Sequence, residues 1–299
     1  MSAQQVPASL RTLVARAVDY AGLFPPAGLE LPRAVANYAD YRRSPHAWML
    51  GRFVLGAAQL DAFRVAVAAH LGDAAWHLSA LAGDDLAAAF ARVARFNEEG
   101  GGAAVDMVEA RATTPEQIEA IAAAAPAGMP VYVEIPAGED ARDLLRALAA
   151  VRLRAKIRTG GLAREAFPSP QVVARFVRAC YAQGVAFKAT AGLHHALRAE
   201  HALTYEPDSA RATMHGFLNV FLTAALCYNG LDAPSAELLM RAADAAEMVF
   251  DNDGAAWGEY RVSTDEIATA RRRLVVSFGS CSFEEPVDDL AALGLLSEA

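Results

Sequence analysis

The sequence contains almost no lysine. Of its 27 basic residues only Lys156 and Lys188 are lysines, and the remaining 25 are arginines. The chain therefore supplies its surface charge with arginine, and two lysines kept against this bias indicate tasks that arginine cannot perform. A desolvated lysine can lose its proton and act as a base or nucleophile, whereas arginine stays protonated above pH ~12.

Cysteines and long apolar runs are also scarce. The three cysteines, Cys180, Cys227 and Cys281, are odd in number and far apart, which favours reduced thiols in a cytoplasmic protein. No apolar run approaches the ~20 residues of a membrane span, and the stretch MSAQQVPASLRTLVARAVDY lacks the pattern of a signal peptide. The sequence predicts a cytoplasmic protein with no membrane partner.

The chain has no excess of positive charge. It carries 35 acidic residues, a net charge of −8 and a pI near 5.4, which argues against nucleic acid or an anionic membrane as a partner. An anionic substrate would therefore need a local basic pocket. The length of 299 residues, with 54% hydrophobic and 21% charged residues, fits a well-packed α/β barrel or two ordinary domains.

Short β-type runs alternate with helical stretches rich in Ala and Leu, which is the pattern of βα units and a parallel sheet. The predicted strands are residues 18–24, 49–56, 75–83, 103–110, 130–138, 154–161, 185–192 and 273–280. Residues 199–270 are predicted to form a mostly helical insertion between strands seven and eight. The pattern predicts an α/β protein with one (β/α)8 TIM-barrel domain over residues 1–299. A Rossmann or flavodoxin-type sheet is the alternative, but the Gly-rich turn after its first strand is missing.

Both lysines come three to four residues before a glycine that ends a predicted strand. Catalytic groups of such barrels lie at the C-terminal ends of the strands, and a separation of 32 residues between Lys156 and Lys188 equals one βα unit. Side chains alternate along a strand, so Arg158 should face the same way as Lys156, and Thr190 the same way as Lys188. Like charges at this range favour a neutral, nucleophilic lysine that attacks a carbonyl carbon. A lysine that only binds an anion is the alternative.

Five segments in order along the chain, VDYAGLFPPA, AAVDMVEA, KIRTG, VAFKATAG and SFGSCSF, fall on predicted strands one, four, six, seven and eight. They resemble the corresponding segments of deoxyribose-phosphate aldolase and its class I aldolase relatives. The resemblance implies a barrel enzyme in which Lys156 forms a Schiff base, Lys188 keeps that lysine reactive and Asp106 relays protons.

The sequence departs from that family at several positions. The glycine pair after the strand-seven lysine is replaced by AGLHH, and Arg158 stands where the family has a small hydroxyl residue. Tyr132 takes the place of a relay lysine, with Glu134 close by, and Phe24 replaces the lysine of the first segment. These departures argue against an ordinary sugar-phosphate aldolase and favour another carbonyl substrate on the same scaffold.

Four of the seven histidines, His194, His195, His201 and His215, lie within 22 residues. No HxH or HExxH spacing occurs among them, so that substrate contacts by His194 and His195 are favoured over a metal site. In the segment FGSCSF, backbone N–H groups and hydroxyls of Gly279, Ser280 and Ser282 could hold an anion at the start of a helix, with a tight turn as the alternative.

The sequence thus predicts a cofactor-independent lyase or aldolase-like enzyme that acts on a small, anionic or hydroxylated carbonyl substrate, without a metal. The predicted catalytic residues are Lys156, Lys188 and Asp106. The predicted substrate contacts are Arg158, Glu134, Thr190, His194, His195, Gly279, Ser280 and Ser282. Two alternatives stay open, a metal- or anion-binding isomerase or hydrolase on the same barrel, and a non-catalytic homologue that binds a small molecule. A homo-oligomer is left open as well.

Overall fold

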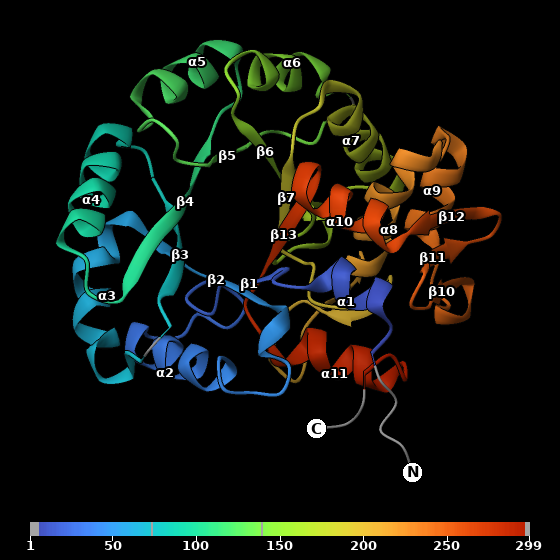
Figure 1. Ribbon diagram of the computed structural model, residues 1–299, viewed down its shortest axis with the longest axis horizontal. Coiled ribbons are helices and arrows are strands. Elements are labelled where there is room, and N and C mark those ends of the chain that lie inside the picture. Colours follow the sequence, from blue (N-terminus) through green and yellow to red (C-terminus); the bar gives the residue numbers. More distant parts are fainter. Residues whose placement is uncertain (1–5, 73, 139, 297–299) are drawn as a thin grey trace.

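Eight parallel strands close into a barrel at the centre of the molecule (Figure 1). The computed structural model describes residues 6–72, 74–138 and 140–296. Around the barrel the strands follow the order β1-β13-β7-β6-β5-β4-β3-β2. Their bounds are β1 (Val18–Tyr20), β2 (Leu50–Gly56), β3 (Trp76–Leu81), β4 (Ala103–Arg111), β5 (Val131–Glu134), β6 (Arg154–Arg158), β7 (Phe187–Thr190) and β13 (Val275–Ser280). Each overlaps a predicted strand, and the closed parallel barrel of the α/β class is confirmed.

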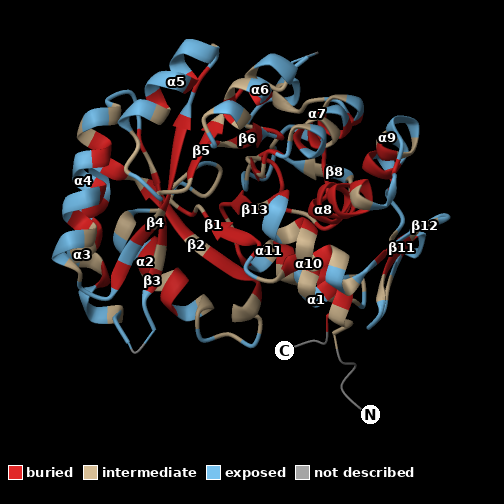
Figure 2. Ribbon diagram, turned by 45° about the horizontal axis from the view of Figure 1, so that its top comes forward, coloured by how far each residue is buried: buried red, intermediate tan, exposed pale blue. Residues whose placement is uncertain are grey.

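Helices surround the barrel and turn their apolar faces toward it, so that their buried residues lie inside and their exposed residues outside (Figure 2). Those around the first seven strands are α1 (Ala8–Val14), α2 (Leu31–Tyr41), α3 (Leu60–Val67), α4 (Leu86–Glu99), α5 (Pro115–Ala124), α6 (Arg142–Ala150) and α7 (Pro170–Gln183), and α11 (Glu284–Ala292) follows β13. The hydroxyls of Thr114 and Ser169 cap α5 and α7 just before their first prolines. Gly184 ends α7 with a φ of +64°, a conformation that favours glycine.

The chain between β7 and β13 is less helical than the sequence predicts. It contains the helices α8 (Phe217–Leu226), α9 (Ala233–Arg241) and α10 (Thr264–Arg273), the hairpin β8 (Ala199–Ala202) and β9 (Arg211–Met214), and the antiparallel sheet of β10 (Met248–Phe250), β11 (Gly254–Trp257) and β12 (Tyr260–Ser263). These strands are three or four residues long, too short to carry a clear hydrophobic period. Every residue of α8 is buried, yet within the described ranges no helix is long and apolar enough to cross a bilayer.

The inside of the barrel is polar, in contrast to the apolar layer between strands and helices. Fully or almost fully buried polar side chains on the barrel strands are Asp19, Ser79, Glu109, Lys156, Lys188, Ser277 and Ser280. The register pairs Lys156 with Lys188, and Arg158 with Thr190, across β6 and β7. The neighbouring positions that alternation and βα spacing predict for these four residues are therefore present in the structure.

Arg271 on α10 joins three elements through backbone carbonyls. Its guanidinium donates to the carbonyl oxygens of Leu13 and Ala15, at 2.7 and 3.0 Å, beside α1. It also donates to those of Val275 and Val276, at 3.0 and 2.5 Å, on β13. A charged donor that satisfies four carbonyls holds α1 against the last strand of the barrel.

Replacement of this arginine should be costly, because it leaves the four carbonyls without their donor. We expect Arg271→Met to lower the free energy of unfolding by about 3 kcal/mol. Arg272→Met is the matched control, because Arg272 is exposed and, among the described residues, bonds only the hydroxyl of Thr269. Urea unfolding followed by circular dichroism measures both, and equal effects of the two variants would contradict the role of Arg271.

Candidate active site

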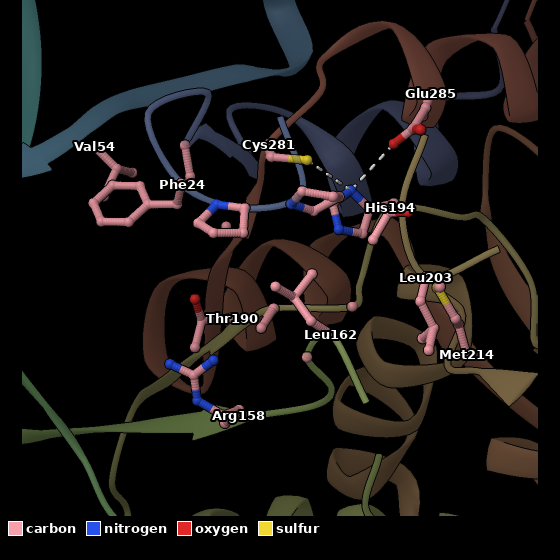
Figure 3. Close-up of a pocket in the computed structure, with 18 of the residues that line it drawn as sticks. Phe24, Val54, Arg158, Leu162, Thr190, His194, Leu203, Met214, Cys281 and Glu285 are labelled. Atoms are coloured by element: carbon pink, nitrogen blue, oxygen red, sulfur yellow. Dashed lines mark hydrogen bonds and ion pairs between the residues drawn. The ribbon is translucent and has the colours of Figure 1, made fainter. Parts of the chain in front are cut away.

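A cavity of about 510 Å³ opens at the C-terminal ends of the barrel strands. Lys156 and Glu109 line its inner part, and a second cavity of about 420 Å³ shares both residues. The larger cavity has an apolar lining that includes Phe24, Val54, Leu162, Leu203 and Met214 (Figure 3). The cavity is therefore mainly apolar and contains a few polar side chains, which is the usual character of a small-molecule site.

Lys156 is held between two carboxylates from neighbouring strands. Its Nζ lies 2.7 Å from Oε2 of Glu109 on β4 and 2.9 Å from Oε2 of Glu134 on β5. Only 5% of the Lys156 side chain is exposed, and that surface belongs to the cavity. Both carboxylates can therefore exchange a proton directly with this amine.

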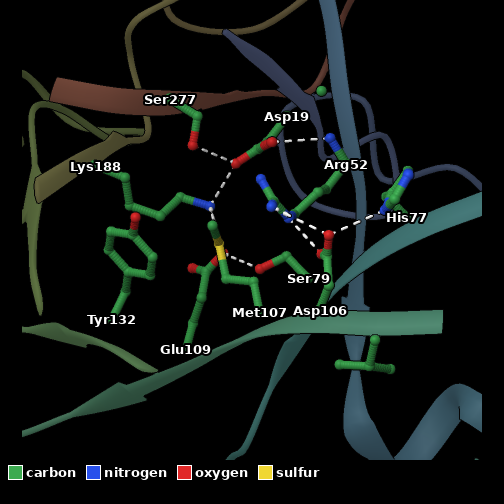
Figure 4. A network of polar contacts seen from close by, with 12 residues as sticks. Asp19, Arg52, His77, Ser79, Asp106, Met107, Glu109, Tyr132, Lys188 and Ser277 are labelled. Carbon is green, nitrogen blue, oxygen red and sulfur yellow. Dashed lines mark hydrogen bonds and ion pairs between the residues drawn. The ribbon is translucent and has the colours of Figure 1, made fainter. Parts of the chain in front are cut away.

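Lys188 lies deeper and shares the carboxylate of Glu109 (Figure 4). Its Nζ is 2.6 Å from Oε1 of Glu109 and 2.7 Å from Oδ2 of Asp19. Burial lowers the pKa of Lys188, but Asp19 and Glu109 outweigh this and raise it above its ordinary value. Burial likewise raises the pKa of Glu109, whereas Lys156 and Lys188 bring it well below its usual range. Lys188 is thus a fixed ammonium and Glu109 a carboxylate at neutral pH.

The carboxylates of this network are held by small residues on the neighbouring strands. Asp19 accepts hydrogen bonds from the hydroxyl of Ser277, at 2.6 Å, and the amide of Arg52, at 2.8 Å. Ser79 donates its hydroxyl to Oε1 of Glu109 at 2.7 Å. A Cβ at Gly51 would lie 2.5 Å from Oδ1 of Asp19, so that only glycine lets this carboxylate approach β2.

Glu134 forms ion pairs with several basic side chains at the rim of the cavity. Besides Lys156 it contacts Nε of Arg158 at 3.1 Å and Nε of Arg111 at 3.7 Å. Burial raises the pKa of Glu134, but Lys156 and then the arginines lower it below its ordinary value. Arg158 lies beside Thr190 at the cavity wall, and 44% of its side chain is exposed.

The structure does not bring Asp106 to the lysines. This carboxylate binds Nε and Nη2 of Arg52, at 2.5 and 3.2 Å, and Nδ1 of His77, at 2.9 Å. All three residues lie in the first halves of their strands, away from the cavity. The β3–β4 register shifts next to Asp106, so that the strand carries Met107 and Glu109 inward toward Lys188 instead. The carboxylate between the lysines is therefore Glu109, three residues later in the same segment.

A second polar group forms the wall opposite the lysines. Nδ1 of His194 lies 3.1 Å from Oε2 of Glu285, 3.1 Å from Oγ of Ser280 and 3.7 Å from Sγ of Cys281. The hydroxyl of Tyr205, on the chain that follows β8, is 3.4 Å from the same sulfur. Burial lowers the pKa of His194, but its hydrogen bonds to Cys281 and Glu285 raise it to about 10. Sequence reasoning assigned no site role to Cys281, because its partners come from distant segments of the chain.

The other predicted contacts of this wall are already used within the protein. His195 binds Asp289 at 3.1 Å and stacks on His201 with ring centroids 3.3 Å apart. Ser280 accepts a hydrogen bond from the amide of Ser282, whose hydroxyl in turn accepts one from the amide of Glu285. Gly279 lines the cavity directly. The amides of Ser282 and Glu285 are therefore already bonded to the serine hydroxyls of this segment.

The fourth histidine of the cluster lies elsewhere. Nε2 of His215 donates a hydrogen bond to the carbonyl oxygen of Pro168, 2.7 Å away. In the described part of the chain, no group of three His, Cys, Asp or Glu side chains has the arrangement of a metal site.

Comparison of the chain with models of known protein families and with curated proteins finds no match in either. The motifs shared with class I aldolases therefore stay a resemblance, and the geometry of the cavity carries the functional argument.

The pKa of His194 predicts a pH dependence of stability. Between pH 6.5 and about 10 the folded protein keeps a proton on His194 that the unfolded chain releases. Stability from this group is complete below pH 6.5 and is lost as the pH rises, by about 1.4 kcal/mol per pH unit within that window. We expect urea unfolding at pH 7, 8 and 9 to show this slope in the wild type and not in His194→Gln.

Glu285→Gln is the partner control for this prediction. It removes the carboxylate on His194 and should weaken the slope without removing the imidazole. Parallel pH profiles for the wild type and His194→Gln would contradict a protonated His194.

Proposed function

We propose that the protein is a cofactor-independent, class I aldolase-like lyase in which Lys156 forms a Schiff base with a small carbonyl substrate. The observation that carries this proposal is the position of the Lys156 amine. It faces a cavity at the C-terminal end of a parallel barrel and contacts two carboxylates, one of which is shared with a second lysine. The ordered motifs of the sequence support the same chemistry.

The carboxylates of the network lie where they can accept a proton from the Lys156 amine. Besides Lys156, the cations of the network are Lys188, Arg158 and Arg111, and its carboxylates are Asp19, Glu109 and Glu134. A neutral amine is the form that adds to a carbonyl carbon, and Glu109 and Glu134 are the acceptors for the proton that Lys156 must lose.

The reaction can be written with the residues of this network. Lys156 passes its proton to Glu134 or Glu109 and its lone pair adds to the carbonyl carbon. The carbinolamine takes a proton back on its hydroxyl and loses water to give an iminium ion. A base removes the proton of the β-hydroxyl, the C–C bond breaks, and its electron pair moves into the iminium to give an enamine and an aldehyde. Protonation of the enamine carbon and addition of water release the second product and restore the amine.

In this proposal Glu109 takes the proton-carrying role that the sequence assigned to Asp106, because it is the carboxylate in contact with both amines. We interpret residues 199–270 as an insertion into a single TIM-barrel domain. Leu203, directly after β8, and Met214, at the end of β9, supply part of the cavity wall from this segment.

Borohydride trapping tests the proposal directly. The protein is incubated with a panel of small aldehydes and ketones, reduced and digested, and the modified residue is identified by mass spectrometry. Only two lysines and the α-amino group can respond. We expect a stable adduct on Lys156 that is absent from Lys156→Arg, which keeps the positive charge between Glu109 and Glu134. No adduct on Lys156 with any carbonyl compound would refute Schiff-base chemistry and favour a protein that binds small molecules without catalysis.

The role of Glu109 gives a second prediction. We expect Glu109→Gln to slow adduct formation on Lys156 roughly 100-fold, because the proton acceptor at 2.7 Å is lost. Asp106→Asn is the matched control and should leave the trapping rate within about twofold, since Asp106 contacts Arg52 and His77 instead. A larger effect at Asp106 than at Glu109 would reverse the assignment.

A further inference from the structure

The guanidinium of Arg158 has unused donors at the cavity wall. Its Nε binds Glu134, but its two Nη groups form no hydrogen bond or ion pair with the described residues. The hydroxyl of Thr190, paired with Arg158 in the sheet register, likewise has no partner among those residues. Both side chains line the cavity and lie next to each other in Figure 3. A guanidinium with free donors beside a hydroxyl is suited to a carboxylate.

The position of Arg158 limits which carboxylate it can bind. Nζ of Lys156 and Nε of Arg158 contact the two oxygens of the same Glu134 carboxylate, at 2.9 and 3.1 Å. The Lys156 amine and the Arg158 guanidinium are therefore separated by the single carboxylate group that both contact. A substrate whose carbonyl carbon is attacked by Lys156 can therefore reach Arg158 with a carboxylate attached directly to that carbon.

The opposite wall is a poor site for a second anion. The carboxylates of Glu285 and Asp289 already pair with His194 and His195, and the amides of Ser282 and Glu285 are already bonded to serine hydroxyls. A phosphate at this wall would compete with the Glu285 carboxylate for His194. Much of the remaining lining is apolar and includes Phe24, Leu162 and Met214. This part of the cavity therefore fits a substrate whose chain beyond the carbonyl group is uncharged and largely apolar.

Resting on the proposed function, we infer that the substrate is a 2-oxo acid with an uncharged, non-phosphorylated chain. Its carboxylate binds the Nη groups of Arg158 and the hydroxyl of Thr190, its carbonyl carbon meets Nζ of Lys156, and its chain extends toward the apolar part of the cavity.

Trapping with matched probes tests the inference. 2-Oxobutanoate, 2-butanone and dihydroxyacetone phosphate are each incubated with the protein and borohydride, and adduct on Lys156 is quantified over a range of probe concentrations. We expect half-maximal trapping at roughly 10- to 100-fold lower concentration for 2-oxobutanoate than for either other probe. In Arg158→Gln the preference should be abolished, so that this variant traps 2-oxobutanoate no better than it traps 2-butanone, and circular dichroism shows that the variant is folded. Arg146→Gln, at an exposed arginine on α6 that pairs with Asp143, should change nothing.

The outcomes separate the inference from the proposed function. If none of the three probes, nor any member of the broader aldehyde and ketone panel, gives an adduct on Lys156, the proposed function fails and the inference fails with it. If 2-butanone or dihydroxyacetone phosphate is trapped as readily as 2-oxobutanoate, or if Arg158→Gln keeps the preference for the acid, Schiff-base chemistry stands and the 2-oxo acid is overturned.

Discussion

The carboxylate of Glu109 lies between two ammonium groups inside the barrel, one on each of its oxygens. Burial of an ion is expensive unless its charge and hydrogen bonds are satisfied, and the loss of one partner from such a group costs about 3–5 kcal/mol. Glu109 joins β4 to β6 and β7, and Asp19 extends the chain of contacts through Lys188 to β1. The charges thus constrain half of the barrel from within, and they also fix the orientation of the Lys156 amine.

This constraint changes how the barrel is filled. Barrels of this type usually fill their interior with layers of branched apolar side chains. Here the inner positions carry ion pairs and small hydroxyl residues, and a second group around Arg52 and Asp106 lies nearer the N-terminal ends of the strands. Stability must come mainly from the outer layer, where the other faces of the strands pack on the helices. The division leaves the inner surface available for chemistry.

The sequence predicts the barrel well because the alternation of side chains along the strands and the spacing of the βα units are both regular. Strand alternation and βα spacing place Lys156 beside Lys188 and Arg158 beside Thr190, and the structure has these pairs. At β4 the resemblance indicated Asp106, but the register shifts next to that residue and Glu109 contacts the lysines instead.

Contacts between distant segments could not be read from local patterns. Asp19 reaches Lys188 only because the barrel closes, over 169 residues of sequence. Cys281 contacts His194 and Tyr205 only because three separate segments of the chain come together at the cavity. The strands between β7 and β13 were not predicted for another reason. Each is too short to show the alternation of apolar and polar residues that identifies a strand.

The bias against lysine has a further consequence for selectivity. Free aldehydes and reducing sugars condense with any accessible lysine, and most proteins present many such amines on their surface. In this chain every lysine lies inside the barrel, and the charged outer surface is arginine, aspartate and glutamate. A reactive carbonyl compound therefore reaches a lysine amine only if it enters the cavity and fits the side chains that line it. The composition of the exterior thus protects the specificity of the interior from competing condensation.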